Sequence, residues 1–381
     1  MGIGKLLGVK AKPGAAGRHA RFRPAPDEVP RPPLGPPSRA QPYGGHRRHP
    51  MSNPEIALSH RKGDMPAALR LLTLPTLGPL LVLLLFAAYF GLTTRTFLAP
   101  GNLSLVVQQS VIVGTLAIGQ TLVILTAGID LANGAVAVFA TIVAGRLANA
   151  GNNAMACLAF AIFLCVLVGF LIGLLVSRLR LPPFIVTLGF LGIVTAATRL
   201  IAQGGAFPVT DDFLSWTGNA LSIHGTAVTY GTMLMIGLYV IIWYLLTQTA
   251  WGRHVYAIGN HREAARLVGI PVENRLLSVY TLAAFIYGVG AWLALGRIPN
   301  ADPNALQNAN LDSITAVVIG GTSLFGGRGN VWGTLVGTLI VSVLRNGLTL
   351  SGIDPLWQDL VTGVLVIGAV ALDQISRRRQ R

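Results

Sequence analysis

The sequence predicts an all-α, polytopic membrane protein, because its composition is strongly apolar and its apolar residues come in long runs. The 381 residues are 52% hydrophobic and 11% charged, with a mean hydropathy of +0.61, whereas soluble globular proteins carry about 25% charged residues. Beyond Leu71, long apolar runs alternate with short polar breaks. Most runs reach the ~20 residues that a helix needs to cross the hydrocarbon core of a bilayer. We therefore expect about ten transmembrane helices.

Residues 1–69 differ in composition from the rest and are predicted to form a basic, disordered, cytoplasmic tail. Residues 1–65 hold 12 Lys and Arg against 4 Asp and Glu, and the stretch RPAPDEVPRPPLGPPSRAQPYGG is rich in proline and glycine. Such a segment cannot bury enough apolar surface to offset the entropy of ordering. Because it has little aromatic interleaving, we expect it to face anionic lipid rather than nucleic acid. Met51 or Met65 could also be the first residue of the native chain.

The apolar runs define a transmembrane domain at 70–374, which a short basic tail follows at 375–381. The run at 313–325 is short and rich in glycine, so we expect a broken or re-entrant helix there. The ten predicted spans are 71–92, 103–125, 134–150, 154–176, 184–202, 227–247, 276–296, 313–325, 331–350 and 356–373.

The uneven distribution of arginine predicts the orientation of the spans. With the N-terminus in the cytoplasm and ten spans, 12 of the arginines after residue 65 lie on the cytoplasmic side and 5 on the outer side. The terminal RRRQR also lies inside, as an even number of spans requires. We therefore expect both termini and the polar segment at 248–275 in the cytoplasm, and the acidic segment at 203–226 outside.

Two segments that stand five spans apart resemble each other and indicate an internal repeat. GFLIGLLVSRLR (169–180) aligns with GTLVGTLIVSVLR (333–345) with one inserted residue, and both end in Val-Ser-x-Leu-Arg. The two copies would cross the membrane in opposite directions, as in transporters built from two inverted five-helix halves with the path at their interface. Because apolar helices match one another easily, chance similarity is the alternative to duplication.

A short charged helix is predicted within the cytoplasmic segment at 248–275. In GNHREAARLVGI (259–270), Gly259 and Asn260 are expected to form a turn that ends in a helix N-cap, and the residues that follow favour a helix. Gly269 is expected to end this helix in a left-handed turn, and Pro271 prevents its continuation.

This helix of about two turns is too short to be stable alone, so it must dock on another surface. Its small residues suit close packing against a protein better than insertion into lipid. We therefore favour a protein partner over the lipid interface.

The same stretch resembles a known family of transporters. EAARLVG (263–269) matches the E-A-A-x-x-x-G core of the cytoplasmic loop in permease subunits of ATP-binding-cassette importers. Four longer stretches resemble the ribose- and xylose-type sugar permeases, and the likeness covers about residues 70–373. They are TLVILTAGIDLANGAV (121–136), LPPFIVTLGFLGI (181–193), GRHVYAIGNHREAARLVGI (252–270) and LDSITAVVIGGTSLFGGRGNVWGTLVG (311–337).

The resemblance implies a permease subunit in the cell inner membrane that forms a sugar path together with a second permease copy, identical or a paralogue. It also implies a separate ATPase subunit and a periplasmic or lipid-anchored sugar-binding protein, which would largely determine the sugar. No cofactor is expected in this chain. The helix that couples to the ATPase would include Gly259, Arg262, Glu263, Ala264, Ala265, Arg266 and Gly269.

Four polar residues near the ends of spans are candidates for lining the path. Asn133 stands where the family often has valine, and Asn310 stands where it often has an acidic residue, so the substrate preference here would differ from that of a ribose system if these positions line the pore. Asp130 and Asp312 should face protein or water, because an ionised group at mid-membrane costs ~2.5–3.5 kcal/mol. Each carboxylate either lines the path or caps a helix end. A proton relay by the pair would instead indicate a secondary transporter.

The sequence excludes some functions and leaves two alternatives. GGTSLFGGRGN (320–330) lacks the Lys and the hydroxyl of a phosphate-binding loop, and no HExxH, GxSxG or CxxC pattern occurs, so we expect no enzyme activity in this chain. Cys157 and Cys165 are expected to pack in the core rather than to form a disulfide or bind a metal. The alternatives are an ion-coupled secondary transporter and a related ATP-driven permease for branched-chain amino acids or nucleosides.

Overall fold

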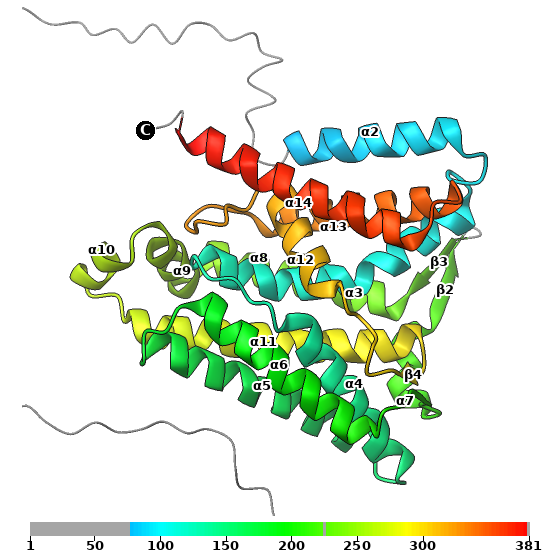
Figure 1. Cartoon of the computed structure of the whole chain (residues 1–381), viewed down its shortest axis with the longest axis horizontal. Coiled ribbons are helices and arrows are strands. Elements are labelled where there is room, and N and C mark those ends of the chain that lie inside the picture. Colours follow the sequence, from blue (N-terminus) through cyan, green and yellow to red (C-terminus); the bar gives the residue numbers. More distant parts are fainter. Residues whose placement is uncertain (1–76, 224–225, 379–381) are drawn as a thin grey trace, which may run out of the picture. The chain divides into compact units, whose positions relative to one another are not determined.

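Long apolar helices make up almost all of the described chain, and the all-α, polytopic fold class is confirmed (Figure 1). The computed structural model describes residues 77–223 and 226–378, and the predicted tail at 1–69 lies outside them. Six helices are long and apolar enough to cross a membrane: α3 (Pro100–Leu125), α5 (Ala154–Ser177), α6 (Pro183–Ala202), α8 (Tyr230–Gln248), α11 (Val272–Arg297) and α13 (Val331–Leu350). Four more helices complete the set: the shorter α2 (Leu77–Thr93), α4 (Asn133–Asn149) and α12 (Ala309–Ile319), and the longer but less apolar α14 (Pro355–Arg378).

Each of the ten predicted spans overlaps one of these helices, but several predicted boundaries are wrong; α11, for example, begins at Val272 and not at 276. The span predicted at 313–325 is instead the 11-residue α12, which ends before Gly321 because the backbone there turns left-handed, with φ of 88°. Helix α8 begins only at Tyr230, because the residues before it form a strand. Helix α14 continues to Arg378, so the tail predicted at 375–381 is helical up to that residue, and 379–381 lie outside the described residues.

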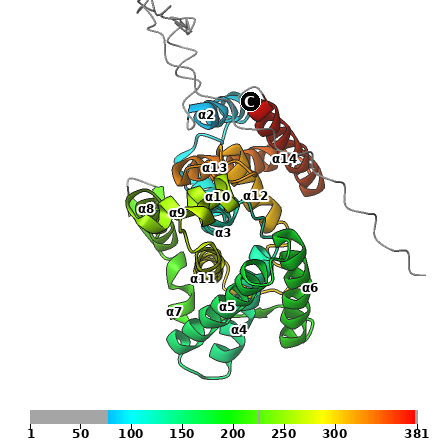
Figure 2. The same cartoon turned by 90° about the vertical axis from the view of Figure 1, so that its left-hand side faces the viewer.

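Two central helices, α3 and α11, organise the bundle, and Figure 2 shows them from the end with other helices around them. Helix α11 packs against α4 and α5, while α3 packs against α12 and α13. Likewise α4 packs against α5 and α6, while α12 packs against α13 and α14. The contacts among α3–α6 and α11–α14 thus correspond, whereas α2 packs on α13 and α8 packs on α3, so the first helices of the two halves have different neighbours.

Small residues let the central helices approach closely. A Cβ at Gly169 of α5 would lie 2.6 Å from the carbonyl oxygen of Tyr280 in α11, and a Cβ at Gly119 of α3 would lie 3.1 Å from that of Ala283. Gly114 of α3 approaches Thr338 of α13 in the same way. Close contacts of this kind hold apolar helices together where lipid supplies no hydrophobic driving force.

Two short helices close one end of the bundle, which we call the α10 end. Helix α9 (Ala250–Asn260) follows α8 directly, and α10 (Arg262–Leu267) leads into α11. The buried side chains of Ile258, Ala265, Val272 and Leu276 form a small core between these elements. The predicted loop at 248–275 is therefore mostly helical.

Short strands and an aromatic stack close the other end, which we call the strand end. β1 (Phe207–Pro208) pairs with β4 (Asn300–Ala301), and β2 (Ala220–Ile223) pairs with β3 (Thr226–Thr229). Between them, α7 (Asp212–Ser215) and the 3-10 helix η1 (Trp216–Gly218) pack on α11, where Trp216 stacks on Trp292 at 6.0 Å. Sequence periodicity does not predict these strands, because two to four residues are too few to show alternation.

Candidate functional site

Helix α10 begins with a histidine cap. The imidazole Nδ1 of His261 accepts a hydrogen bond from the backbone N–H of Ala264 at 3.1 Å. The predicted turn and N-cap at Gly259 and Asn260 are wrong, because these residues are the last two of α9. Helix α9 continues that far because its apolar face, including Ile258, is buried against α11.

The end of α10 has the predicted left-handed glycine. Gly269 has φ of 85°, its N–H donates to the carbonyl of Arg266 at 3.1 Å, and the N–H of Ile270 donates to the carbonyl of Ala265 at 3.1 Å. This pair of bonds is the Schellman arrangement, in which a residue without a Cβ is strongly favoured. The glycine fixes the direction in which the chain leaves α10.

The two faces of α10 differ in what they contact. Ala265 is buried against α9 and α11, whereas Leu267 and Val268 are 88% and 76% exposed. Arg266 donates to Glu263 at 3.2 Å and to Glu273 of α11 at 2.5 Å, and the bond to Glu273 raises the pKa of Arg266. Helix α10 is thereby held on α11 while it presents two adjacent apolar side chains outward.

A glycine junction connects the α10 end with the centre of the bundle. A Cβ at Gly259 of α9 would lie 1.8 Å from the carbonyl oxygen of Leu125, the last residue of α3. The N–H of Gly327 donates to that same carbonyl at 3.0 Å. Gly326 and Gly327 have φ of 80° and 72° and lie against Ala127 and Asn260. The glycines of 320–330 therefore allow the backbone of this segment to lie directly against the ends of α3 and α9.

From this junction the chain returns into the bundle before α4 begins. Ala127 has φ of 61°, and the Asp130 carboxylate accepts from the backbone N–H of Ala132 at 2.8 Å. Asp130 is buried. Asp130 thus fixes the irregular segment ahead of α4.

The N-termini of α4 and α12 meet inside the bundle. Asn133, the first residue of α4, is fully buried and donates to Ser313 Oγ of α12 at 2.7 Å and to Gln120 Oε1 of α3 at 3.3 Å. Asn310 of α12 donates to the carbonyl of Leu131 at 3.4 Å. Asn133 and Asn310 therefore link the two halves of the molecule.

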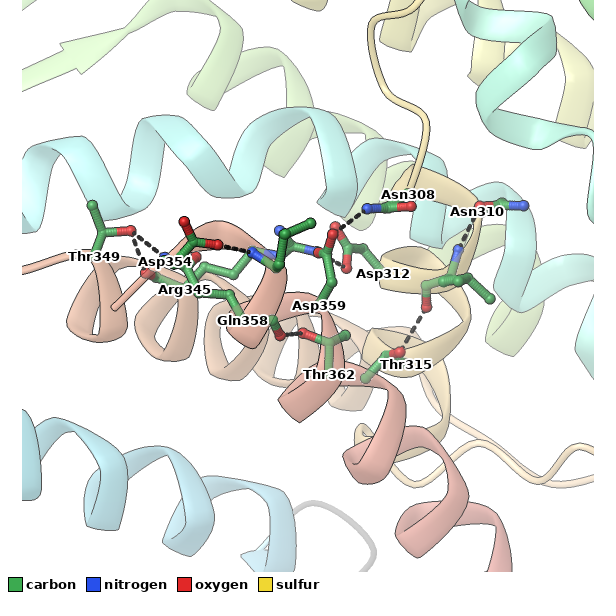
Figure 3. Close-up of polar contacts among 12 residues, drawn as sticks. Asn308, Asn310, Asp312, Thr315, Arg345, Thr349, Asp354, Gln358, Asp359 and Thr362 are labelled. Atoms are coloured by element: carbon green, nitrogen blue, oxygen red, sulfur yellow. Dashed lines mark hydrogen bonds and ion pairs between the residues drawn. The ribbon is translucent and has the colours of Figure 1, made fainter. Parts of the chain in front are cut away.

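An ion-paired cluster holds the start of α12 (Figure 3). Arg345 of α13 contacts Asp312 of α12 at 2.8 Å and Asp359 of α14 at 3.1 Å. Asn308 donates to Asp359 at 2.8 Å. The Asp312 carboxylate is therefore neutralised by an arginine rather than hydrogen-bonded to the first N–H groups of its own helix.

The structure brings Asp130, Asn133, Asn310 and Asp312 to the meeting point of two helix N-termini, and it places Arg262, Glu263 and Arg266 on α10. The sequence analysis missed Ser313, Gln120, Arg345 and Asp359 as partners. An arginine inside an apolar span was a usable signal for Arg345, because such a charge must find a partner. Ser313 and Gln120 gave no signal of their own, because uncharged polar residues are common at helix contacts.

Residues 102–370 match the family described as branched-chain amino acid transport system / permease component. A fructose import permease protein from Rhizobium meliloti is 43% identical over 311 residues, which are 80% of this chain and 86% of that protein. A ribose import permease protein from Bacillus subtilis (strain 168) is 36% identical over 305 residues, 78% and 92% of the two chains. A galactose/methyl galactoside import permease protein from Escherichia coli (strain K12) is 32% identical over 320 residues, 80% and 95% of the two chains. No solved structure gives a significant match.

The glycine junction yields a first prediction. Gly259→Ala should destabilise the protein by about 1–3 kcal/mol, because the added methyl group collides with backbone that cannot move independently. The melting temperature of the detergent-purified protein should fall by several degrees in a tryptophan-fluorescence melt. The matched control is Gly237→Ala, where nothing lies within 4 Å of the added Cβ. Equal melting temperatures for the two variants would contradict the close contact.

The ion-paired cluster yields a second prediction. Arg345→Met should lower the melting temperature, because it leaves the buried Asp312 carboxylate unpaired beside Asp359, at a cost on the order of 3 kcal/mol. The double variant Arg345→Met, Asp312→Asn should recover part of the loss, because the uncompensated charge is gone. A double variant that is less stable than Arg345→Met would show that the carboxylate itself, and not its pairing, is what α12 needs.

Proposed function

The chain belongs to the family described as branched-chain amino acid transport system / permease component, and from that membership we propose that it is the membrane-spanning subunit of an ATP-driven importer for a monosaccharide. The relatives that are 43%, 36% and 32% identical are named for the import of fructose, ribose and galactose. The chain covers 86% to 95% of their lengths.

The observation that carries the proposal is the apolar tip of α10. Leu267 and Val268 are 88% and 76% exposed on a six-residue helix that is too short to be stable alone. The adjacent charges of Glu263 and Arg266 keep the tip out of the hydrocarbon core. These features suit insertion into a groove of a separate ATPase subunit, which would hydrolyse the ATP.

The environment of the two carboxylates favours this proposal over an ion-coupled secondary transporter. Asp312 is paired with Arg345, and the Asp130 carboxylate accepts a hydrogen bond from the N–H of Ala132. A proton relay needs carboxylates that exchange protons with a water-filled path. Carboxylates that hold helix ends in place instead have structural roles.

In the proposed assembly the protein spans the cell inner membrane. The α10 end faces the cytoplasm, and the strand end faces the outside. A sugar-binding protein, periplasmic or lipid-anchored, would deliver the sugar at the strand end, and a second permease copy, identical or a paralogue, would complete the path. Both termini would be cytoplasmic, in keeping with the excess of arginine on that side.

The docking proposal predicts that changes at the end of α10 prevent the sugar-loaded binding protein from stimulating ATP hydrolysis. Leu267→Asp and Gly269→Val should insert into the membrane normally but should lose copurification with the ATPase, because one removes apolar contact area and the other changes how the chain leaves α10. Binding-protein-stimulated ATP hydrolysis in proteoliposomes should fall by tenfold or more, by analogy with the loss of an interface hot spot worth about 2 kcal/mol. The control is Leu92→Asp, whose side chain is 89% exposed at the other end of the bundle. If both α10 variants copurify with the ATPase and support stimulated ATP hydrolysis as the wild type does, the docking proposal is wrong and α10 is only a surface anchor.

The orientation predicts which introduced thiols an impermeant reagent can reach. Asn152→Cys and Asn219→Cys should be labelled in intact cells, whereas Asn260→Cys and Val268→Cys should be labelled only after the membrane is opened. The native Cys157 and Cys165 are buried and should contribute little background. Labelling of Val268→Cys from outside would reverse the orientation and exclude docking to a cytoplasmic ATPase.

A further inference from the structure

A cavity of about 290 Å³ lies where α4 and α12 meet. Its walls come from α4, α6 and the segment that leads into α12, and it extends along α6 toward the strand end. Its lining includes Gly134 of α4 and five polar side chains: Thr195, Thr198, Arg199, Gln307 and Asn310. Drug-sized ligands occupy pockets of about 300–1,000 Å³, so this cavity suits a smaller molecule such as a single sugar ring.

Several of the lining groups have no partner within the described protein. Thr195, Gln307 and the guanidinium of Arg199 make no hydrogen bond or ion pair there, while Asn310 is held by Leu131 and by the N–H of Leu311. An amide both donates and accepts, a hydroxyl does the same, and a guanidinium only donates. A sugar ring, whose hydroxyls both donate and accept, complements this set.

We propose that this cavity is a monosaccharide subsite within the permease itself, with Gln307 and Asn310 on one side of the ring and Thr195 and Arg199 on the other. The inference rests on the proposed function and adds that the permease, and not only its binding protein, contacts the sugar hydroxyls. Gln307 and Asn310 are then specificity-determining residues of the path.

The chemistry of the lining distinguishes a sugar from other small solutes. None of the described residues that line the cavity carries a carboxylate, so it offers no counter-charge to the ammonium group of an amino acid or to a metal cation. Asp312 points instead to Arg345, outside the lining. A hydrocarbon chain in the cavity would also be unfavourable, because it would leave the amide, hydroxyl and guanidinium groups without hydrogen bonds.

Protection of an introduced thiol tests the subsite. The full-length variant Gln307→Cys, in nanodiscs, should react with a methanethiosulfonate reagent, and the native Cys157 and Cys165 are 3% and 0% exposed. D-Fructose, D-ribose and D-galactose are added as probes at rising concentration. The labelling rate should fall about tenfold once the accepted sugar exceeds its dissociation constant about tenfold, as mass action requires. The matched control is Asn304→Cys, in the same segment but outside the lining, whose labelling should not change.

A second substitution tests the role of the guanidinium. Adding Arg199→Met to Gln307→Cys should raise the sugar concentration that gives half-protection roughly tenfold, because one charge-assisted hydrogen bond is lost. Protection by D-gluconate and by no neutral sugar would overturn the assignment to a neutral monosaccharide, and protection by leucine alone would assign the cavity to an amino acid.

The two proposals fail in different ways. Unchanged labelling of Gln307→Cys with every probe, or equal protection of Asn304→Cys, overturns the subsite while ATP-driven uptake by the wild type stands. Absence of ATP-driven sugar uptake by the wild type, reconstituted with its ATPase and binding protein, overturns the proposed function instead.

Discussion

The hydrogen bond from Asn133 to Ser313 joins two helix N-termini in the middle of the bundle, and the arrangement of the other helices depends on it. A bilayer offers no water to unpaired backbone groups, so a chain that leaves the helical state at membrane depth must be enclosed by protein. Here the non-helical segment before α4 lies against the first turn of α12, where Asn310 donates to the carbonyl of Leu131. The central pair α3 and α11, with α5 and α13 packed beside them, encloses this junction on both sides.

The same constraint explains why the α10 end is connected to the centre by backbone rather than by side chains. The carbonyl of Leu125 ends α3, accepts the N–H of Gly327 and lies against Gly259, so α9 and the segment at 320–330 contact α3 without intervening side chains. Eight residues after Leu125, at Asn133, the chain begins α4. A displacement of α9 by a docked ATPase would therefore act directly on the segment that carries Asp130 and Asn133. Backbone contacts between rigid elements transmit such shifts because a packed interior does not deform continuously.

The sequence predicted the helices well because a membrane span needs only length and apolarity, and both are properties of consecutive residues. It also predicted the left-handed turn at Gly269, whose cause is local. It placed the ends of α12 wrongly: the start depends on contacts distant in the chain, such as Asp312 with Arg345, and the end depends on the left-handed backbone at Gly321. The start of α10 was also misplaced, because burial of α9 extends that helix to Asn260. Asp130, Asn133, Asn310 and Asp312 could be selected as unusual polar residues, but Ser313 and Arg345 could be identified as their partners only from the folded chain.

The two helix N-termini at the centre are held by different chemistry, although the contacts among α3–α6 and α11–α14 correspond. The start of α4 is fixed by neutral groups and by the buried Asp130, which accepts a hydrogen bond from a backbone N–H. The start of α12 is fixed by charge, through Arg345 between Asp312 and Asp359. The proposed sugar subsite lies between the two helix starts, with Gly134 from one side and Asn310 from the other. A movement that begins at the glycine junction would therefore reach the subsite through its α4 wall, because the segment between Leu125 and α4 leads directly to Gly134.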